Sequence, residues 1–338
     1  MVIRRALTVV LASLSFSAAA CTGGSPTLGA SAPGVSSPTQ TSAGTTSQSA
    51  SGVPPPSRTA VPVPPTTPPH ASPFDVERVL GGVRDLAAMG PRDAASAAGD
   101  RAAAYVAARL RAAGYRVTVQ PFTVPAGVSW GVPVPAGSTA NVVADPPGFD
   151  PRRPHVVIGA HLDTVPRSPG AEDNASGLMV LAEVARIVRE QPGALPVRFV
   201  AFGAEEARGG NGTRYAFGSR HFVTALGGAE RTAVGGMLAL DRVGVRAAAV
   251  PVCSGGRGTP ALAEAIRAAA TSASVPTRAC TNRASDHVSF ERVGIPAARL
   301  GSVPYAAYHS AGDVPSVVDR RQLARSGAVV LAWLRSLG

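Results

Sequence analysis

The stretch that decides the fold is HVVIGAHLDT, residues 155–164, in which an apolar run ends in a His-x-Asp group. Two more short apolar runs follow, at 197–203 and 236–240. Runs that are apolar on both faces are typical of central strands in a sheet that helices cover on both sides. Between the first two runs, residues 177–190 carry apolar side chains at helical spacing. This order of strand, helix and strand predicts a parallel sheet with helical crossovers.

The flanking segments extend the same pattern. Helical spacing recurs over 74–89, 94–113, 260–270 and 320–337, and strand alternation over 115–122 and 139–144. Asp319 stands where it can cap the last helix. We therefore predict a single α/β domain at residues 75–338, with a mostly parallel, mixed central sheet covered by helices on both faces.

Residues 1–21 have the features of an export signal. A positively charged start precedes an apolar core at 6–16 and small residues at 17–20. Cys21 follows directly, as in bacterial lipoprotein signals, in which this cysteine becomes the lipidated N-terminus. We expect an exported protein held by a lipid on Cys21 at the outer face of the cytoplasmic membrane. The alternative is an ordinary secretory signal and a secreted protein.

Residues 22–74 consist almost wholly of Ser, Thr, Pro, Gly, Ala and Val, with no acidic residue and one arginine. Such a composition buries too little apolar surface to offset its chain entropy. We expect this segment to be a disordered tether between the anchor and the folded domain.

The formal net charge is +11, and every basic residue apart from histidine is arginine. The arginines are scattered, and no basic run is interleaved with aromatic residues. Nucleic-acid binding proteins concentrate their basic charge in a patch or stripe. The charge therefore does not indicate a nucleic-acid partner.

Metal-competent side chains stand where the predicted strands end and near the predicted helix starts. They are His161, Asp163, Asp173, Glu205, Glu206, Asp241 and His309, and Tyr308 precedes the last of them. Taken singly, each is more typical of a helix cap, a turn or a solvated surface. Because carboxyl ends of parallel strands meet at one edge of a sheet, we expect these side chains to lie together. Two histidines with three of these five carboxylates form a ligand set suited to a pair of zinc ions.

In sequence order, these residues occupy motifs that resemble a known family. The motifs are GAHLDT (159–164), DNASG (173–177), GAEE (203–206), GS (218–219), MLALD (237–241), SDH (285–287) and YHS (308–310). The series resembles the co-catalytic zinc aminopeptidases, typified by secreted bacterial leucyl aminopeptidases. That family includes glutamate carboxypeptidase, the transferrin receptor and, with altered metal content, glutaminyl cyclase. The resemblance spans residues 75–338 and implies an aminopeptidase that holds two zinc ions (Zn2+) per chain.

The resemblance implies a role for each ligand. Asp173 would bridge the two zinc ions. His161 and Asp241 would complete one metal site, and Glu206 and His309 would complete the other.

The resemblance also implies roles for residues beside the metals. Glu205 would be the general base that takes a proton from the activated water, and Tyr308 would hydrogen-bond the oxyanion. Asp163 would hydrogen-bond His161 and fix its tautomer.

Two further features follow from the resemblance. Asp286 and His287 match a family motif and are expected in the pocket wall or behind the ligands, not on the metals. Members of the family hold the peptide bond that corresponds to Asp173–Asn174 in the cis form.

The chain departs from the family pattern in two places. Residues 207–217 form a longer connection than usual, which either shapes the pocket rim or is a surface insertion. Arg242 stands where an apolar residue is usual. It either steers substrate choice or forms an ion pair beside the metals.

Cys253 and Cys280 remain once Cys21 is assigned to the signal. Exported proteins meet an oxidising environment, in which paired cysteines form disulfides. We therefore expect a disulfide between these two residues.

The sequence thus predicts an exported aminopeptidase that acts, as a monomer, on peptides with a free N-terminus. Carboxypeptidase action remains an alternative. So does a related zinc hydrolase of amino-acid conjugates, in which the bridging Asp lies much farther along than the 12 positions between His161 and Asp173 (173 − 161). A glutaminyl cyclase is disfavoured because His161 completes the ligands for two metals. A non-catalytic surface binding module would have lost ligands, and none is missing here.

Overall fold

The computed structural model describes residues 73–209, 214–257 and 260–338. The predicted signal at 1–21, with Cys21, lies outside these residues, and so does nearly all of the predicted tether at 22–74. The folded domain includes Phe74, because its ring packs against the hydrophobic core beside Gly327. In the described ranges, no helix is both long and apolar enough to cross a bilayer.

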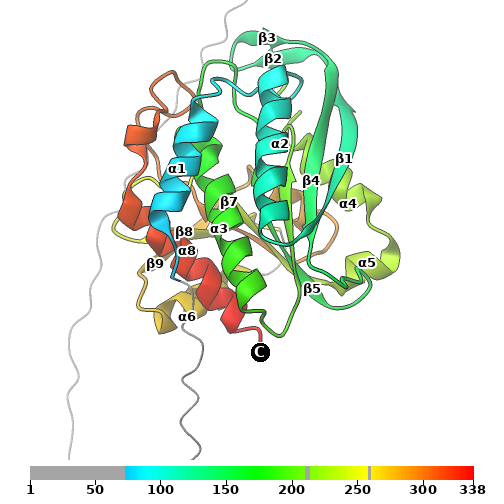
Figure 1. The fold of residues 1–338 in the computed structure, drawn as a ribbon, viewed down its shortest axis with the longest axis vertical. Coiled ribbons are helices and arrows are strands. Elements are labelled where there is room, and N and C mark those ends of the chain that lie inside the picture. Colours follow the sequence, from blue (N-terminus) through cyan, green and yellow to red (C-terminus); the bar gives the residue numbers. More distant parts are fainter. Residues whose placement is uncertain (1–72, 210–213, 258–259) are drawn as a thin grey trace, which may run out of the picture. The chain divides into compact units, whose positions relative to one another are not determined.

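An eight-stranded sheet forms the middle of the domain (Figure 1). Its strand order is β1-β4-β6-β5-β7-β10-β8-β9. The strands are β1 (Arg116–Val124), β4 (Gly137–Asp145), β5 (His155–His161), β6 (Val197–Phe202), β7 (Val234–Asp241), β8 (Val250–Ser254), β9 (Thr277–Thr281) and β10 (Ala297–Gly301). The central strands β6, β5, β7 and β10 run parallel, whereas β4 joins β6 and β8 joins β10 in antiparallel fashion. The predicted mixed, mostly parallel sheet is confirmed.

Helices cover both faces of the sheet. One face carries α1 (Val76–Ala87), α2 (Ala97–Ala112), α3 (Gly177–Glu190), α6 (Ala261–Ser272) and α8 (Arg320–Arg335). The other carries α4 (Phe217–Ala225) and α7 (His287–Glu291), while α5 (Gly228–Ala233) leads into β7. Figure 1 shows α1, α2, α3 and α8 side by side in front of the strands.

Strand β5 illustrates why its sequence is apolar throughout. Val156 and Ile158 pack into the larger core cluster, under the first set of helices. Val157, between them, packs into the smaller cluster on the opposite face. Successive side chains of a strand point to opposite faces of the sheet. When helices cover both faces, no position of the strand faces solvent, and apolar residues are favoured throughout.

A small hairpin that we did not predict stands apart from the main sheet. It comprises β2 (Gly127–Ser129) and β3 (Val132–Val134), joined by a two-residue turn. Trp130 and Gly131 of the turn have φ angles of 47° and 78°. A turn with two positive φ angles matches the twist of a two-stranded hairpin. The turn leaves the Trp130 side chain 53% exposed.

Candidate active site

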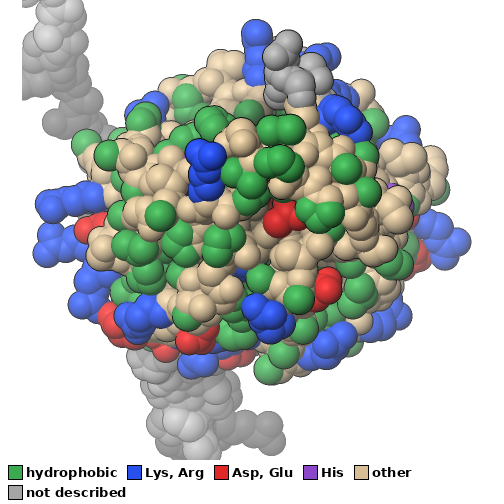
Figure 2. Space-filling model, turned by 90° about the horizontal axis from the view of Figure 1, so that it is seen from above, with side chains coloured by type: hydrophobic (Ala, Val, Ile, Leu, Met, Phe, Trp, Pro, Cys, Tyr) green, Lys and Arg blue, Asp and Glu red, His purple; other side chains and the backbone are tan. Residues whose placement is uncertain are grey.

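Three neighbouring parallel strands deliver the predicted ligands to one edge of the sheet. His161 is the last residue of β5, and Asp241 is the last residue of β7. Glu205 and Glu206 follow β6 after a short turn. Because β6, β5 and β7 are adjacent, their carboxyl ends lie together. Figure 2 shows a face of the molecule with a few acidic side chains near its centre and most arginines around its margin.

Asp173 lies between the two histidines. Its Oδ1 is 3.1 Å from Nε2 of His161, and its Oδ2 is 3.1 Å from Nε2 of His309. Asp173 belongs to η1 (Ala171–Ser176), a distorted turn of helix just before α3. The Asp173–Asn174 peptide bond is cis, which confirms that expectation.

Three groups of three possible ligands lie close together, and two of them share Asp173, whereas the third consists of His161, Glu205 and Glu206. His161, Asp173 and Asp241 make the first group, and Asp173, Glu206 and His309 make the second. Within each group the ligand atoms lie within 4.8 Å of one another. His161, Asp173, Glu206 and Asp241 are buried. The structure therefore brings all five predicted ligands together.

Asp163 contacts His161 in a different way from the one we expected. The Nδ1 of His161 lies 3.1 Å from the backbone oxygen of Asp163, to which it can donate, and 3.7 Å from the carboxylate. The carboxylate instead accepts the backbone N–H groups of Glu205 at 2.8 Å and Glu206 at 3.0 Å. Asp163 thus orients the histidine through its main chain and holds both glutamates with its side chain.

The sequence analysis did not identify two further residues, which bind the backbone around Asp173. The Asp313 carboxylate accepts the backbone N–H groups of Glu172 and Asp173 at 2.8 and 3.1 Å. The buried Arg92 donates to the backbone oxygens of Leu162 at 3.3 Å and Gly170 at 3.0 Å. These contacts join segments far apart in the chain, and no local pattern in the sequence signals them.

The site concentrates buried carboxyl groups. Burial raises the pKa of Glu206 to about 7, and burial together with nearby acids raises the pKa of Glu205 well above its usual range. Burial opposes ionisation of Asp241 as well, but Arg299 and His161 outweigh it and hold the pKa of Asp241 well below its usual range. Buried carboxylates at this density require compensating positive charge.

Asp286 and His287 lie beside the ligands but belong to none of the three groups. Both are fully buried, and burial raises the pKa of Asp286 to about 7. His287 donates through Nε2 to the backbone oxygen of Asn282 at 2.9 Å. Burial and the charge of Arg299 lower the pKa of His287 to about 4.

Aromatic rings cover the His309 side of the site. The Tyr308 ring stacks on the His309 ring with centroids 3.6 Å apart. Trp130 approaches His309 edge-on, at 4.3 Å between centroids. Tyr308 is 38% exposed, so it stands between the ligands and solvent.

Arg208 connects the β2–β3 hairpin to the segment that follows Glu206. Its guanidinium donates to the backbone oxygens of Pro125 and Pro135, one on each side of the hairpin, and pairs with Asp93 at 2.8 Å. The Arg208 side chain is 2% exposed. The start of the long connection at 207–217 therefore contributes to the rim of the site, whereas residues 210–213 lie outside the described ranges.

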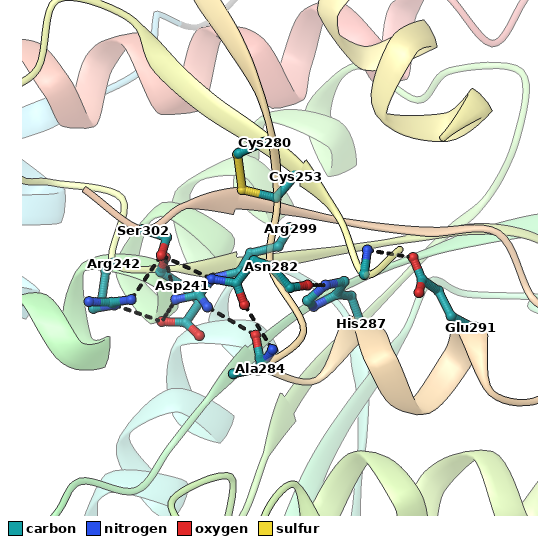
Figure 3. Close-up of a disulfide and its surroundings, with 11 residues drawn as sticks. Asp241, Arg242, Cys253, Cys280, Asn282, Ala284, His287, Glu291, Arg299 and Ser302 are labelled. Carbon is teal, nitrogen blue, oxygen red and sulfur yellow. Dashed lines mark hydrogen bonds and ion pairs between the residues drawn. A yellow bond between two sulfur atoms is a disulfide. The ribbon is translucent and has the colours of Figure 1, made fainter. Parts of the chain in front are cut away.

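The expected disulfide is present in the structure. Cys253 of β8 and Cys280 of β9 are bonded, with Cα atoms 4.3 Å apart (Figure 3). They occupy paired positions on the two strands.

The chain belongs to peptidase family M28, whose sequence profile matches residues 141–334. It is 32% identical over 187 residues to aminopeptidase YwaD of Bacillus subtilis, covering 52% of this chain and 40% of the relative. It is 31% identical over 243 residues to leupeptin-inactivating enzyme 1 of Streptomyces exfoliatus, covering 70% of this chain and 50% of the relative. The chain thus spans half or less of the length of these relatives.

Solved structures share the fold. BSAP, a zinc aminopeptidase from Bacillus subtilis, superposes with a TM-score of 0.70 at 21% identity, over 78% of this chain and 95% of that one. A glutaminyl cyclase from Fimbriiglobus ruber gives 0.66 at 24% identity, over 82% and 99%. At these identities the likeness establishes the fold alone.

Proposed function

We propose that the chain is a di-zinc aminopeptidase that removes N-terminal residues from peptides. The observation that carries this proposal is the position of Asp173. Its two carboxylate oxygens face His161 and His309 at the same distance, 3.1 Å, so that one carboxylate serves two ligand groups. An arrangement of this kind suits two metal ions held side by side.

The donor set fits zinc. Imidazole nitrogens and carboxylate oxygens are zinc ligands, and each group of three leaves room for water or substrate to complete the coordination. Nε2 of His309 and Nε2 of His161, the nitrogens that would bind the metals, both face carboxylate oxygens of the cluster. Asp173, Glu206 and Asp241 are buried carboxylates gathered in one place, and a bound cation would explain such a cluster.

The roles of the surrounding residues follow from their positions. Zinc at these ligands supplies a Lewis acid that acidifies water and polarises the scissile carbonyl. Glu205, held beside Glu206 by the Asp163 carboxylate, takes a proton from the attacking water and passes it to the leaving amine. The Tyr308 hydroxyl donates a hydrogen bond to the oxyanion that develops on the substrate.

The buried acids also favour a free N-terminus over a free C-terminus. An α-ammonium group is attracted by carboxylates, whereas a C-terminal carboxylate is repelled by them. Glu205, Glu206 and Asp286 all lie in this cluster. We therefore place aminopeptidase action ahead of carboxypeptidase action.

The test is a substrate comparison on the zinc-loaded protein. Aminoacyl-arylamides are expected to be hydrolysed, N-acetylated versions of the same arylamides are not, and a chelator abolishes the activity. Cyclisation of N-terminal glutamine without arylamide hydrolysis would instead identify a glutaminyl cyclase. Equal hydrolysis of free and N-acetylated substrates would point to a hydrolase of amino-acid conjugates.

A further inference from the structure

Two arginines lie against Asp241 at the edge of the site (Figure 3). Nη2 of Arg299 is 3.0 Å from Oδ1 of Asp241, and Nε of Arg242 is 3.9 Å from the same atom. In the described part of the chain, no other arginine pairs with a predicted zinc ligand. We call Arg242 and Arg299 the arginine pair.

The two members of the pair differ in exposure. The Arg299 side chain is 3% exposed, and its Nη1 is bound to the backbone oxygen of Ala284 at 3.0 Å. The Arg242 side chain is 12% exposed. Its guanidinium lies 4.3 Å from the centre of the ring of Tyr308, which is itself 38% exposed.

Polar groups surround Arg242. Nη2 of Arg242 donates to Oγ of Ser302 at 2.8 Å, and Nδ2 of Asn282 donates to the same oxygen at 3.2 Å. Ser302 and Asn282 are only partly buried. This rim is therefore rich in hydrogen-bond donors, in contrast to the carboxylates that make up the rest of the site.

Neutralisation of Asp241 does not account for both arginines. Arg299 is the closer and more buried partner, and one close cation already compensates one buried carboxylate. Arg242 is 0.9 Å farther from that oxygen (3.9 − 3.0) and is held in place by Tyr308 and Ser302. A guanidinium held in this way, with N–H groups to spare, is suited to binding a carboxylate from outside the protein.

We propose that Arg242 binds a carboxylate of the substrate and that the substrates are peptides whose N-terminal residue is Glu or Asp. This inference rests on the proposed aminopeptidase function. An acidic N-terminal residue carries an ammonium group and a carboxylate a few bonds apart. The site offers the matching pair, a cluster of buried acids with an arginine on its rim. Arg299 acts as a positioning residue, because it neutralises Asp241 and so leaves Arg242 free for the substrate.

The experiment compares substrates that differ only in charge. With the zinc-loaded full chain, kcat/KM is measured for Glu-, Gln- and Leu-arylamides, which lack a C-terminal carboxylate. We expect Glu to exceed Gln by at least ten-fold, in line with a charge-assisted hydrogen bond (about 10- to 100-fold). The comparison of Glu with Gln uses the unaltered protein and therefore does not depend on the folding of any variant.

Variants then assign the effect to Arg242. Arg242→Met is expected to remove the preference for Glu, mainly through KM, and so to lower kcat/KM for the Glu-arylamide by at least ten-fold more than for the Leu-arylamide. The matched control is Arg246→Met, four positions along and exposed, which should keep the preference. Preference for Gln or Leu over Glu in the unaltered chain, or an equal loss in both variants, would overturn the proposal.

A substrate carboxylate can belong to the side chain of the N-terminal residue or to the C-terminus of a dipeptide, and a second comparison separates these two sources. Leu-Leu and Leu-Leu-amide differ only at the C-terminus, and we expect similar kcat/KM values for them. A strong preference for Leu-Leu that disappears in Arg242→Met would assign Arg242 to the C-terminal carboxylate of dipeptides. That outcome overturns the acidic N-terminal class.

Binding measurements test the carboxylate site independently of the proposed aminopeptidase activity. Calorimetric titration with L-glutamate and L-glutamine measures recognition without catalysis. Tighter binding of glutamate, lost in Arg242→Met, together with no hydrolysis of any arylamide, would refute the aminopeptidase and keep the carboxylate site. Hydrolysis of arylamides with equal binding of glutamate and glutamine would refute the carboxylate site and keep the aminopeptidase.

Discussion

The Asp163 carboxylate positions the adjacent acids Glu205 and Glu206, to which we assign different proposed roles. Asp163 accepts both of their backbone N–H groups, at 2.8 and 3.0 Å, and so fixes the direction in which each side chain leaves the chain. Glu206 then reaches His309 at 3.2 Å, within the second ligand group. Glu205 stays in the cluster without belonging to either group that contains Asp173.

We predict that Glu205→Gln and Glu206→Gln fail in different ways. Glu205→Gln keeps the size and hydrogen bonding of the side chain but cannot accept a proton, so kcat should fall by roughly 10²–10⁴-fold while zinc content is retained. Glu206→Gln replaces an anionic ligand by a neutral amide and should lose one zinc ion. Its activity should recover in part with excess zinc.

Metal analysis and steady-state rates on both variants decide this point. The unaltered chain, purified in parallel, is the control. Loss of zinc from Glu205→Gln with full retention in Glu206→Gln would reverse the assignment of base and ligand.

His287 provides a pH-dependent test of the packing behind the ligands. Its pKa is lowered to about 4 in the folded chain, against about 6.5 when unfolded. Between these values the unfolded chain binds a proton that the folded chain does not, so stability falls as the pH falls. From about pH 7.5 to about pH 5, the unaltered chain should lose roughly 2 kcal/mol more free energy of unfolding than His287→Gln. Denaturant unfolding at both pH values measures this difference, and equal losses would show that His287 titrates normally.

Several residues of the site lie beyond what a sequence reveals. The ligands stand in short motifs at strand ends, and motifs of this kind are readable. Asp313, Arg92 and Trp130 act on segments that are distant in the chain, and each looks like an ordinary polar or turn residue in its own neighbourhood. Arg299 is similar, because it is the polar position of a five-residue strand whose other members are apolar or glycine.

At the scale of elements, the β2–β3 hairpin is the part of the site with the least support from the main sheet. Arg208 holds both of its ends, and Gly127 passes so close that a Cβ there would overlap the backbone oxygen of Arg208. The hairpin in turn places Trp130 over His309. Arg208 therefore helps to place Trp130 beside His309.

We predict that Arg208→Met loosens this hairpin. The change leaves Asp93 without its buried partner and should lower the free energy of unfolding by roughly 3 kcal/mol. The emission of Trp130, measured in a Trp333→Phe background to remove the only other tryptophan, should shift to the red. Exposed Arg214→Met, from the same connection, is the control. Unchanged stability and emission would mean that the hairpin is held by other contacts.

The elements predicted from the sequence are those whose burial shows in their composition. Strands β5, β6 and β7 are buried along almost their whole length and appear as apolar runs, and α3 buries one broad stripe. The strands that escaped prediction are shorter or half exposed. Strand β9 has no fully buried residue, and β2 and β3 have three residues each. Such segments are fixed by pairing with neighbours, which a local pattern does not encode.

At the scale of the whole molecule, the candidate catalytic side chains lie at one edge of the sheet, and hydrophobic packing covers the rest of it. The two core clusters enclose the sheet on both faces, so polar side chains accumulate where the central strands end. The predicted anchor and tether precede this domain in the sequence. They remain proposals, because residues 1–72 lie outside the described ranges.

We predict that Cys21 carries the lipid that attaches the protein to a membrane. Expressed in a bacterium with a lipoprotein-processing pathway, the full chain should incorporate radiolabelled palmitate and sediment with membranes. Cys21→Ser should do neither, while Cys253→Ser serves as a control for labelling at another cysteine. Membrane fractionation of Cys21→Ser like that of the unaltered chain would show that a different feature retains the protein.

The central claim is that Asp173 bridges two zinc ions in a catalytic site. The most direct measurement is a zinc titration of the metal-depleted chain in which bound zinc and hydrolysis of a Glu- or Leu-arylamide are followed together. The account predicts full activity at two zinc ions per chain, and little bound zinc or activity in Asp173→Asn. Full activity at one zinc ion per chain, or two tightly bound ions in Asp173→Asn, would contradict it.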